Sequence, residues 1–112
     1  MPQYLLLLHE DPAQYADVSP EEMQAIVARY AEWSRGLRER GRIVGGQKLR
    51  DDGGRHVRAG GAVTDGPYVE GKEVLGGFFT VVADDYDGAV AIARECPHLS
   101  NGWIEVREVE PT

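Results

Sequence analysis

Four consecutive leucines, Leu5–Leu8, stand near the amino terminus inside a segment typical of a β-strand. A strand with one wet face alternates apolar and polar residues, because successive side chains point to opposite faces. The leucine run does not alternate, so we expect the strand Gln3–His9 to be buried on both faces and central in a sheet. The segment Val74–Ala83 is also apolar on both faces near its end. We expect it to be the second central strand.

The clearest helix signal lies between residues 19 and 40. Ser19 is placed to cap the helix, Pro20 takes its first position, and Glu22 completes a capping box. Apolar residues then recur at steps of three and four, which predicts one apolar stripe facing a sheet. The stripe consists of Met23, Ile26, Val27, Tyr30, Trp33 and Leu37.

The remaining segments predict two edge strands and a hairpin. The edge strands are Arg42–Leu49, which Gly45-Gly46 interrupts, and Trp103–Val109, which alternates as a strand with one wet face does. Between the second and third core strands, the short segments His56–Ala59 and Ala62–Asp65 are joined by two glycines. This pattern indicates an extra β-hairpin.

A second helix follows the last central strand. Asp84, Asp85 or Asp87 is placed to cap it, and Pro97 ends it. The order β-α-β-hairpin-β-α-β predicts an α+β fold of the ferredoxin-like βαββαβ type with one added hairpin. Right-handed crossovers then put both helices on the same face of a four-stranded sheet.

No segment is left to cover the other face of this sheet, although its central strands are apolar there as well. Monomers avoid large exposed apolar patches. We therefore expect a homodimer in which the two sheet faces pack together around a two-fold axis.

Length and charge narrow the class of protein. The chain has 112 residues, which fits a single domain over residues 1–112. Its 12 Lys and Arg against 19 Asp and Glu give a net charge of −7, which argues against nucleic acid and against an electrostatic membrane anchor. The longest aliphatic run, Leu5–Leu8, is far short of the roughly 20 residues of a membrane span. One cysteine, Cys96, fits a protein of the reducing cytoplasm.

Two residues are candidates for a catalytic role. Asp65 stands before Gly66-Pro67, where a stiff turn could hold its carboxylate toward a cleft, although aspartate before such a turn also serves as an ordinary turn residue. His9 ends the first strand and could act as a base at the mouth of a barrel. The neighbouring Glu10 points to the opposite face, so the two residues are not a chelating pair.

Other side chains are candidates for ligand binding. Tyr68 and Lys72 follow the Asp65 turn and could bind an acidic or aromatic ligand. Trp33, Tyr30 and Trp103 could line an aromatic pocket between the helices and the sheet, although the helical spacing favours core packing for Trp33 and Tyr30. We expect Cys96 to be a packing residue and His98 to cap the second helix or face solvent. No metal-ligand spacing and no cofactor fingerprint is present, so we expect neither a metal nor a cofactor.

A ten-residue motif gives the chain a resemblance. The segment 64–73 reads Thr-Asp-Gly-Pro-Tyr-Val-Glu-Gly-Lys-Glu, and Leu75-Gly76-Gly77-Phe78 follows. With the opening Tyr4–Leu8 and the segment Ile104–Arg107, it resembles the YCII-related, DGPF-domain family, in which a phenylalanine usually stands at the position of Tyr68. The resemblance covers almost the whole chain.

The resemblance implies a dimeric α+β barrel. Some relatives are thought to use a His–Asp pair, one branch resembles lyases of chlorinated hydroquinones, and many members accompany extracytoplasmic-function sigma factors. The helix expected at residues 19–40 contains no histidine, so that pair does not transfer to this chain.

Two functions therefore remain open. The first is a small cofactor-free lyase or isomerase that moves a proton on a small aromatic or quinone-like substrate held in a cleft of the dimer. The second is an accessory protein that binds a small ligand without chemistry and serves in regulation.

Overall fold

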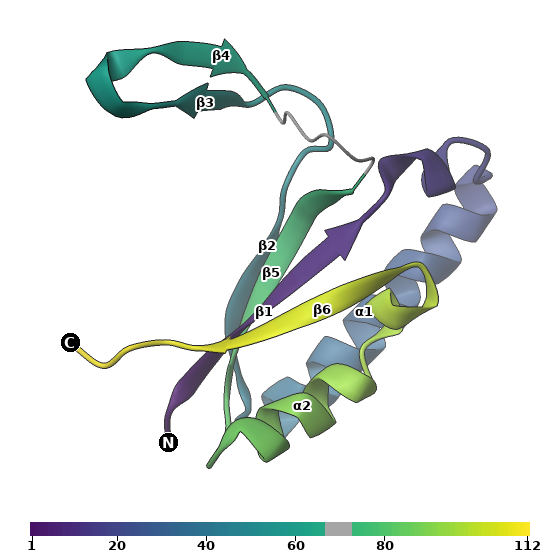
Figure 1. Cartoon of the computed structure of the whole chain (residues 1–112). Coiled ribbons are helices and arrows are strands. Elements are labelled where there is room, and N and C mark those ends of the chain that lie inside the picture. Colours follow the sequence, from purple (N-terminus) through teal and green to yellow (C-terminus); the bar gives the residue numbers. More distant parts are fainter. Residues whose placement is uncertain (67–72) are drawn as a thin grey trace.

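A four-stranded antiparallel sheet forms the centre of the molecule (Figure 1). The computed structural model describes residues 1–66 and 73–112. The strands lie in the order β2-β5-β1-β6, so the two segments with apolar residues on both faces are the central pair, as predicted. Their bounds are β1 Gln3–Glu10, β2 Ile43–Lys48, β5 Val74–Val82 and β6 Gly102–Glu108. The fold is α+β and consistent with the ferredoxin-like arrangement.

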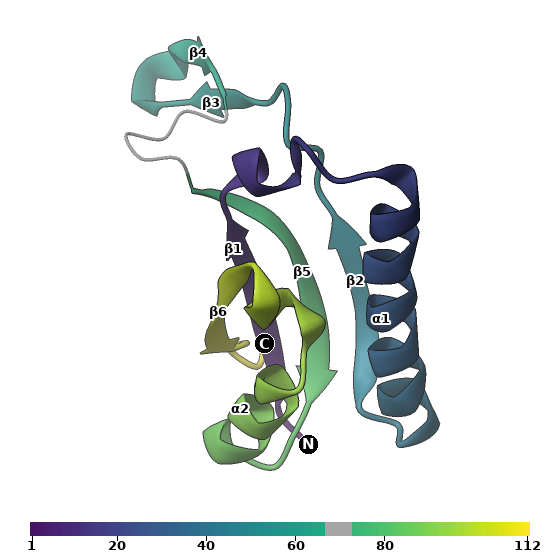
Figure 2. The same ribbon diagram turned by 90° about the vertical axis from the view of Figure 1, so that its right-hand side faces the viewer.

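The two helices, α1 (Pro20–Glu39) and α2 (Tyr86–Arg94), cover the same face of the sheet (Figures 1 and 2). The predicted cap of α1 is confirmed, because the Ser19 hydroxyl accepts the backbone N–H of Glu22 at 3.1 Å. The Asp85 carboxylate caps α2 in the same way, accepting the N–H of Gly88 at 2.9 Å. Unpaired N–H groups at both helix starts are thereby satisfied.

The core lies between this helix layer and the sheet. In β1 the even-numbered residues are buried, whereas Gln3 is exposed and the other odd-numbered residues are half-buried, which is the alternation of a sheet covered on one face only. Tyr4 and Leu6 of β1 pack with Val81 of β5, Leu37 of α1 and Ala89 of α2.

The apolar stripe of α1 divides into two parts. Near the carboxyl end of the helix Leu37 is 1% exposed, whereas Met23 and Val27 in the first half are 38% and 58% exposed. The prediction of one continuous buried stripe therefore holds only for the second half. The first half stands off the sheet and faces a cavity.

The added hairpin is also present. Strands β3 (Arg55–Val57) and β4 (Val63–Asp65) pair with each other in a separate two-stranded sheet. Figure 1 shows this hairpin projecting beyond the end of the main sheet, toward the side that no helix covers. Short 3-10 turns lie at η1 (Pro12–Tyr15), η2 (Ala59–Gly61) and η3 (Pro97–Ser100).

The face of the sheet opposite the helices has an apolar centre. Leu5 and Leu7 of β1 and Phe78 of β5 are half-buried there, and Leu75 and Trp103 are 41% and 48% exposed. Among the described residues, neither helix is both long enough and apolar enough to cross a bilayer.

Candidate functional site

A cavity of about 510 Å³ opens between the first half of α1 and the end of the sheet where β1 finishes. This volume is within the range that holds small organic ligands. Most of the lining is apolar and comes from Leu8, Met23, Ile26, Val27 and Phe79. The principal polar groups of the wall are Glu10, Tyr15, Tyr30, Lys48 and His98.

Glu10 is the last residue of β1 and is only 5% exposed. Its even position in the strand turns the side chain to the helix-covered face, beside Leu8. The Lys48 ammonium lies 3.6 Å from its Oε1 atom, and the same ammonium also pairs with Asp51 at 3.0 Å. Lys48 is 63% exposed, so the ion pair lies at the mouth of the cavity and leaves Glu10 as the buried charge.

Tyr15 donates its hydroxyl hydrogen to the Glu10 carboxylate. Burial raises the pKa of Tyr15 to about 12, and the adjacent negative charge of Glu10 adds to the effect. The Asn101 amide donates to the Tyr15 oxygen and acts in the opposite direction. The neutral phenol of Tyr15, which belongs to η1, thus holds one side of the Glu10 carboxylate in place. Asn101, directly after η3, in turn holds the Tyr15 oxygen.

Tyr30 and His98 form the second polar pair. The Tyr30 hydroxyl lies 2.9 Å from His98 Nδ1, and His98 Nε2 lies 2.8 Å from the backbone oxygen of His9. A carbonyl oxygen only accepts hydrogen bonds, so Nε2 carries the hydrogen and, in the neutral ring, Nδ1 accepts from Tyr30. Burial raises the pKa of Tyr30, and nearby negative groups, Glu10 among them, raise it further.

The expectation that His98 would cap a helix or face solvent is wrong. His98 is 2% exposed, because the chain after α2 turns back under the sheet and presents the imidazole to the carbonyl of His9. Sequence spacing gives no sign of this contact, which joins residues 89 positions apart.

Two glycines make room for the two polar groups. A Cβ atom on Gly76 would overlap Glu10 Oε1 and lie 2.7 Å from Glu10 Cδ. A Cβ atom on Gly102 would overlap the backbone oxygen of His9 and lie 2.6 Å from His98 Nε2. Gly76 also occupies the irregularity in the β1–β5 pairing, where Leu8 pairs with Gly77 and His9 with Leu75.

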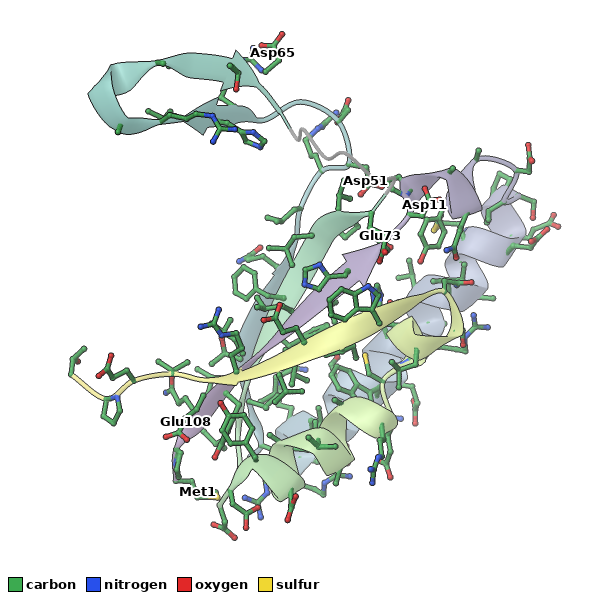
Figure 3. All side chains as sticks on the ribbon, in the orientation of Figure 1. Met1, Asp11, Asp51, Asp65, Glu73 and Glu108 are labelled. Atoms are coloured by element: carbon green, nitrogen blue, oxygen red, sulfur yellow. The ribbon has the colours of Figure 1, made fainter. Side chains whose placement is uncertain are left out.

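The predicted site residues do not gather at this cavity. Asp65 lies at the end of β4 with a 93% exposed side chain, 3.5 Å from the Arg55 guanidinium. Figure 3 shows it on the hairpin, apart from Asp51 and Glu73 near the end of the main sheet. Tyr68 and Lys72 lie outside the described residues.

His9 and Trp103 occupy the other face of the sheet. Their rings stack 4.1 Å apart at an interplanar angle of 8°, and His9 Nε2 lies 3.2 Å from Glu105. Trp33 packs edge-on against Phe79 at 4.9 Å, so it supports the cavity wall from behind. Its indole nitrogen has no hydrogen-bond partner among the described residues.

Cys96 is a buried free thiol whose pKa burial raises to about 11. It is therefore protonated at neutral pH and is a packing residue, as expected. The described part of the chain contains no group of three or more acidic, histidine or cysteine side chains placed to hold a metal ion.

The sequence analysis missed Glu10 and Tyr15 as parts of a site. One signal was available for Glu10: strand alternation places it on the face of Leu6 and Leu8, where a carboxylate is unusual. The sequence pattern favours core packing for Tyr30 and leaves an aromatic pocket open, and the structure places Tyr30 in the cavity wall. No local signal marked Tyr15, which lies in a 3-10 turn.

Comparison with protein-family models identifies a family for this chain. The model of the YCII-related domain family matches residues 2–112, essentially the whole chain. No curated protein matches the chain.

Proposed function

Because the chain belongs to the YCII-related domain family, whose membership specifies no single activity, we propose its function from the cavity: proton transfer on a small aromatic molecule, without a cofactor. Glu10 is the proposed general base, since its carboxylate is buried against an apolar cavity of ligand size. This one observation carries the proposal, because glutamate is rarely buried, and here its carboxylate borders an apolar cavity with its ion-pair partner at the exposed mouth.

The surrounding groups fit this role. Tyr15 and Lys48 bind the carboxylate from the side of η1 and β2 and hold its orientation. The Tyr30–His98 pair faces the same space and offers a polar contact for an oxygen of the ligand. Apolar side chains of α1 and β5 supply the surface on which an aromatic ring packs.

The test measures proton exchange directly. The probe is 4-hydroxyphenylacetone, which has an aromatic ring and an acidic C–H next to a carbonyl, and deuterium uptake from heavy water is followed by NMR. We expect the parent protein to accelerate the uptake, and Glu10→Gln to reduce that acceleration by about 10²–10⁴-fold, the usual contribution of a general base. Glu39→Gln, which changes a 69% exposed carboxylate at the far end of α1, is the matched control.

An accessory protein that binds a ligand without chemistry is the alternative. The same cavity supports it, because apolar volume and hydrogen-bonding groups suffice for binding. Binding of the probe with no deuterium uptake above the uncatalysed rate would favour this alternative. Its regulatory setting and the cytoplasmic location stay predictions from the sequence.

We also propose that two copies pack through the uncovered sheet faces. The apolar centre formed by Leu5, Leu7 and Phe78 supports this arrangement, since water otherwise covers it. The hairpin leans toward the same side and would lie beside the second copy (Figure 1). His9 and Trp103 would then be interface residues, which is a further reason to place the chemistry at Glu10.

A further inference from the structure

The inner wall of the cavity, formed by Glu10, Tyr15, Tyr30 and His98, has an unusual hydrogen-bonding balance. Tyr15 gives its hydroxyl hydrogen to Glu10, and Tyr30 gives its own to His98. The single N–H of neutral His98 goes to the backbone of His9. The polar hydrogens of these three side chains therefore all take part in hydrogen bonds within the protein.

The charge state of His98 is central to this balance. The imidazole is 2% exposed, and both its nitrogens are engaged by uncharged groups, a carbonyl and a phenol. The carbonyl only accepts, so Nε2–H is donated to it, and Nδ1 of the neutral ring is an acceptor. Tyr30 therefore keeps only the lone pairs of its oxygen for a ligand.

Glu10 adds a second acceptor to the same wall. An ionised carboxylate has about four acceptor positions, and Tyr15 and Lys48 use part of them. The inner wall therefore offers acceptors and no free side-chain hydrogen. The side-chain donors of the lining, Gln47 and Lys48, both belong to exposed residues of β2.

From this balance we infer that the cavity selects aromatic ligands that carry a hydroxyl group and discriminates against aromatic ethers, ketones and quinones that carry none. The ligand hydroxyl donates to the Tyr30 oxygen, and the ring packs on the apolar wall. An acceptor-only ligand brings its lone pairs against those of Tyr30 and Glu10 and excludes the water that would satisfy them. The inference shares the cavity with the proposed function but does not require that Glu10 transfer a proton.

Binding of phenol and of its methyl ether, anisole, tests this selectivity. The two rings differ in the hydroxyl hydrogen, which anisole lacks. By titration calorimetry we expect phenol to bind the parent protein about tenfold or more tightly than anisole, the effect of leaving a buried polar group unpaired. Tyr30→Phe should bring the ratio of the two affinities toward one, whereas Tyr86→Phe, at a tyrosine outside the cavity lining, should leave it unchanged.

A second measurement does not depend on a variant. The ¹⁵N chemical shifts of His98 in the parent protein report which ring nitrogen carries hydrogen. We expect a neutral ring with hydrogen on Nε2, and hydrogen on Nδ1 would overturn the inference because Tyr30 would then be free to donate.

The outcomes separate the two proposals. Equal affinity for phenol and anisole overturns the selectivity, while Glu10-dependent deuterium uptake would still support proton transfer. Phenol-selective binding with no deuterium uptake supports the selectivity and removes the catalytic role. Absence of binding by both compounds overturns the inference and also removes the cavity as an aromatic site.

Discussion

Gly76 stands where any side chain would collide with the Glu10 carboxylate. A Cβ atom there would overlap Oε1 and lie 3.1 Å from Cγ, so the carboxylate reaches its place only because residue 76 has no side chain. The glycine pair of β5 thus shapes the cavity as well as the strand pairing, since Gly76 occupies the irregularity between β1 and β5.

The variant Gly76→Ala is therefore expected to displace Glu10 and weaken ligand binding more than it weakens the fold, because the obstructing atoms belong to a side chain that is able to rotate. Phenol affinity and thermal melting measure the two effects. Gly45→Ala on β2 is the control, because a Cβ atom there meets nothing within 4 Å. Equal phenol affinity in the two variants would contradict the positioning role of Gly76.

The two halves of the apolar stripe on α1 differ in burial, so we expect truncations in the two halves to have different effects on stability and on binding. Leu37→Ala removes a side chain that is 1% exposed and should lower the free energy of unfolding by about 2–5 kcal/mol. Val27→Ala changes a cavity residue that is 58% exposed and should cost less than about 1 kcal/mol while weakening phenol binding. Denaturant unfolding and calorimetry check both, and a large stability loss in Val27→Ala would show that the first half of α1 packs on the sheet.

Tyr15 predicts a loss of stability in alkali. Its pKa is about 12 in the folded protein against 10.0 ordinarily, so between these pH values the unfolded chain releases a proton that the folded chain keeps. The contribution of Tyr15 to stability is therefore complete below pH 10 and is lost as pH rises toward 12. Over this pH window the melting temperature of Tyr15→Phe should fall less steeply than that of the parent. An equal decrease in melting temperature for the two proteins would refute the assignment.

Glu10 should influence the same titration. Its charge is the second cause of the raised pKa of Tyr15, after burial. We expect Glu10→Gln to lower the pKa of Tyr15, measured by the ultraviolet absorbance of the phenolate as pH rises. An unchanged Tyr15 titration in this variant would indicate that the two side chains are apart in solution.

The proposed dimer is checked through Leu7 on the uncovered face. Leu7→Arg places a charge in the apolar centre of that face and should yield a monomer in sedimentation velocity at micromolar concentration, where we expect the parent to be a dimer. Ala28→Arg, which adds the same charge at an exposed position on α1, should leave the dimer intact. A monomeric parent would remove the dimer proposal.

The position of Asp65 predicts a silent substitution. Its side chain is 93% exposed and pairs with Arg55 on the hairpin, and such surface pairs contribute little to stability. Asp65→Asn should melt like the parent and bind phenol with the same affinity. Weaker phenol binding in this variant would restore Asp65 as a site residue.

Local sequence patterns were sufficient to predict the helices and strands of the fold. Both central strands, both helices, the Ser19 cap and the added hairpin follow from periodicity, capping and turn residues, which act over a few positions along the chain. The central position of β1 and β5 followed from their apolar residues on both faces, and the handedness of the crossovers put both helices on one face of the sheet.

The candidate site was decided by tertiary structure. Tyr30 and His98 are 68 positions apart, and they meet only because α1 and η3 pack against the same end of the sheet. The periodicity of α1 states that Tyr30 points toward the sheet, but it does not state that the first half of the helix stands off the sheet and leaves a cavity. Glu10 could be assigned to the covered face from strand alternation, yet its partners come from η1 and β2. Contacts between distant elements depend on how those elements pack, and no local pattern carries that information.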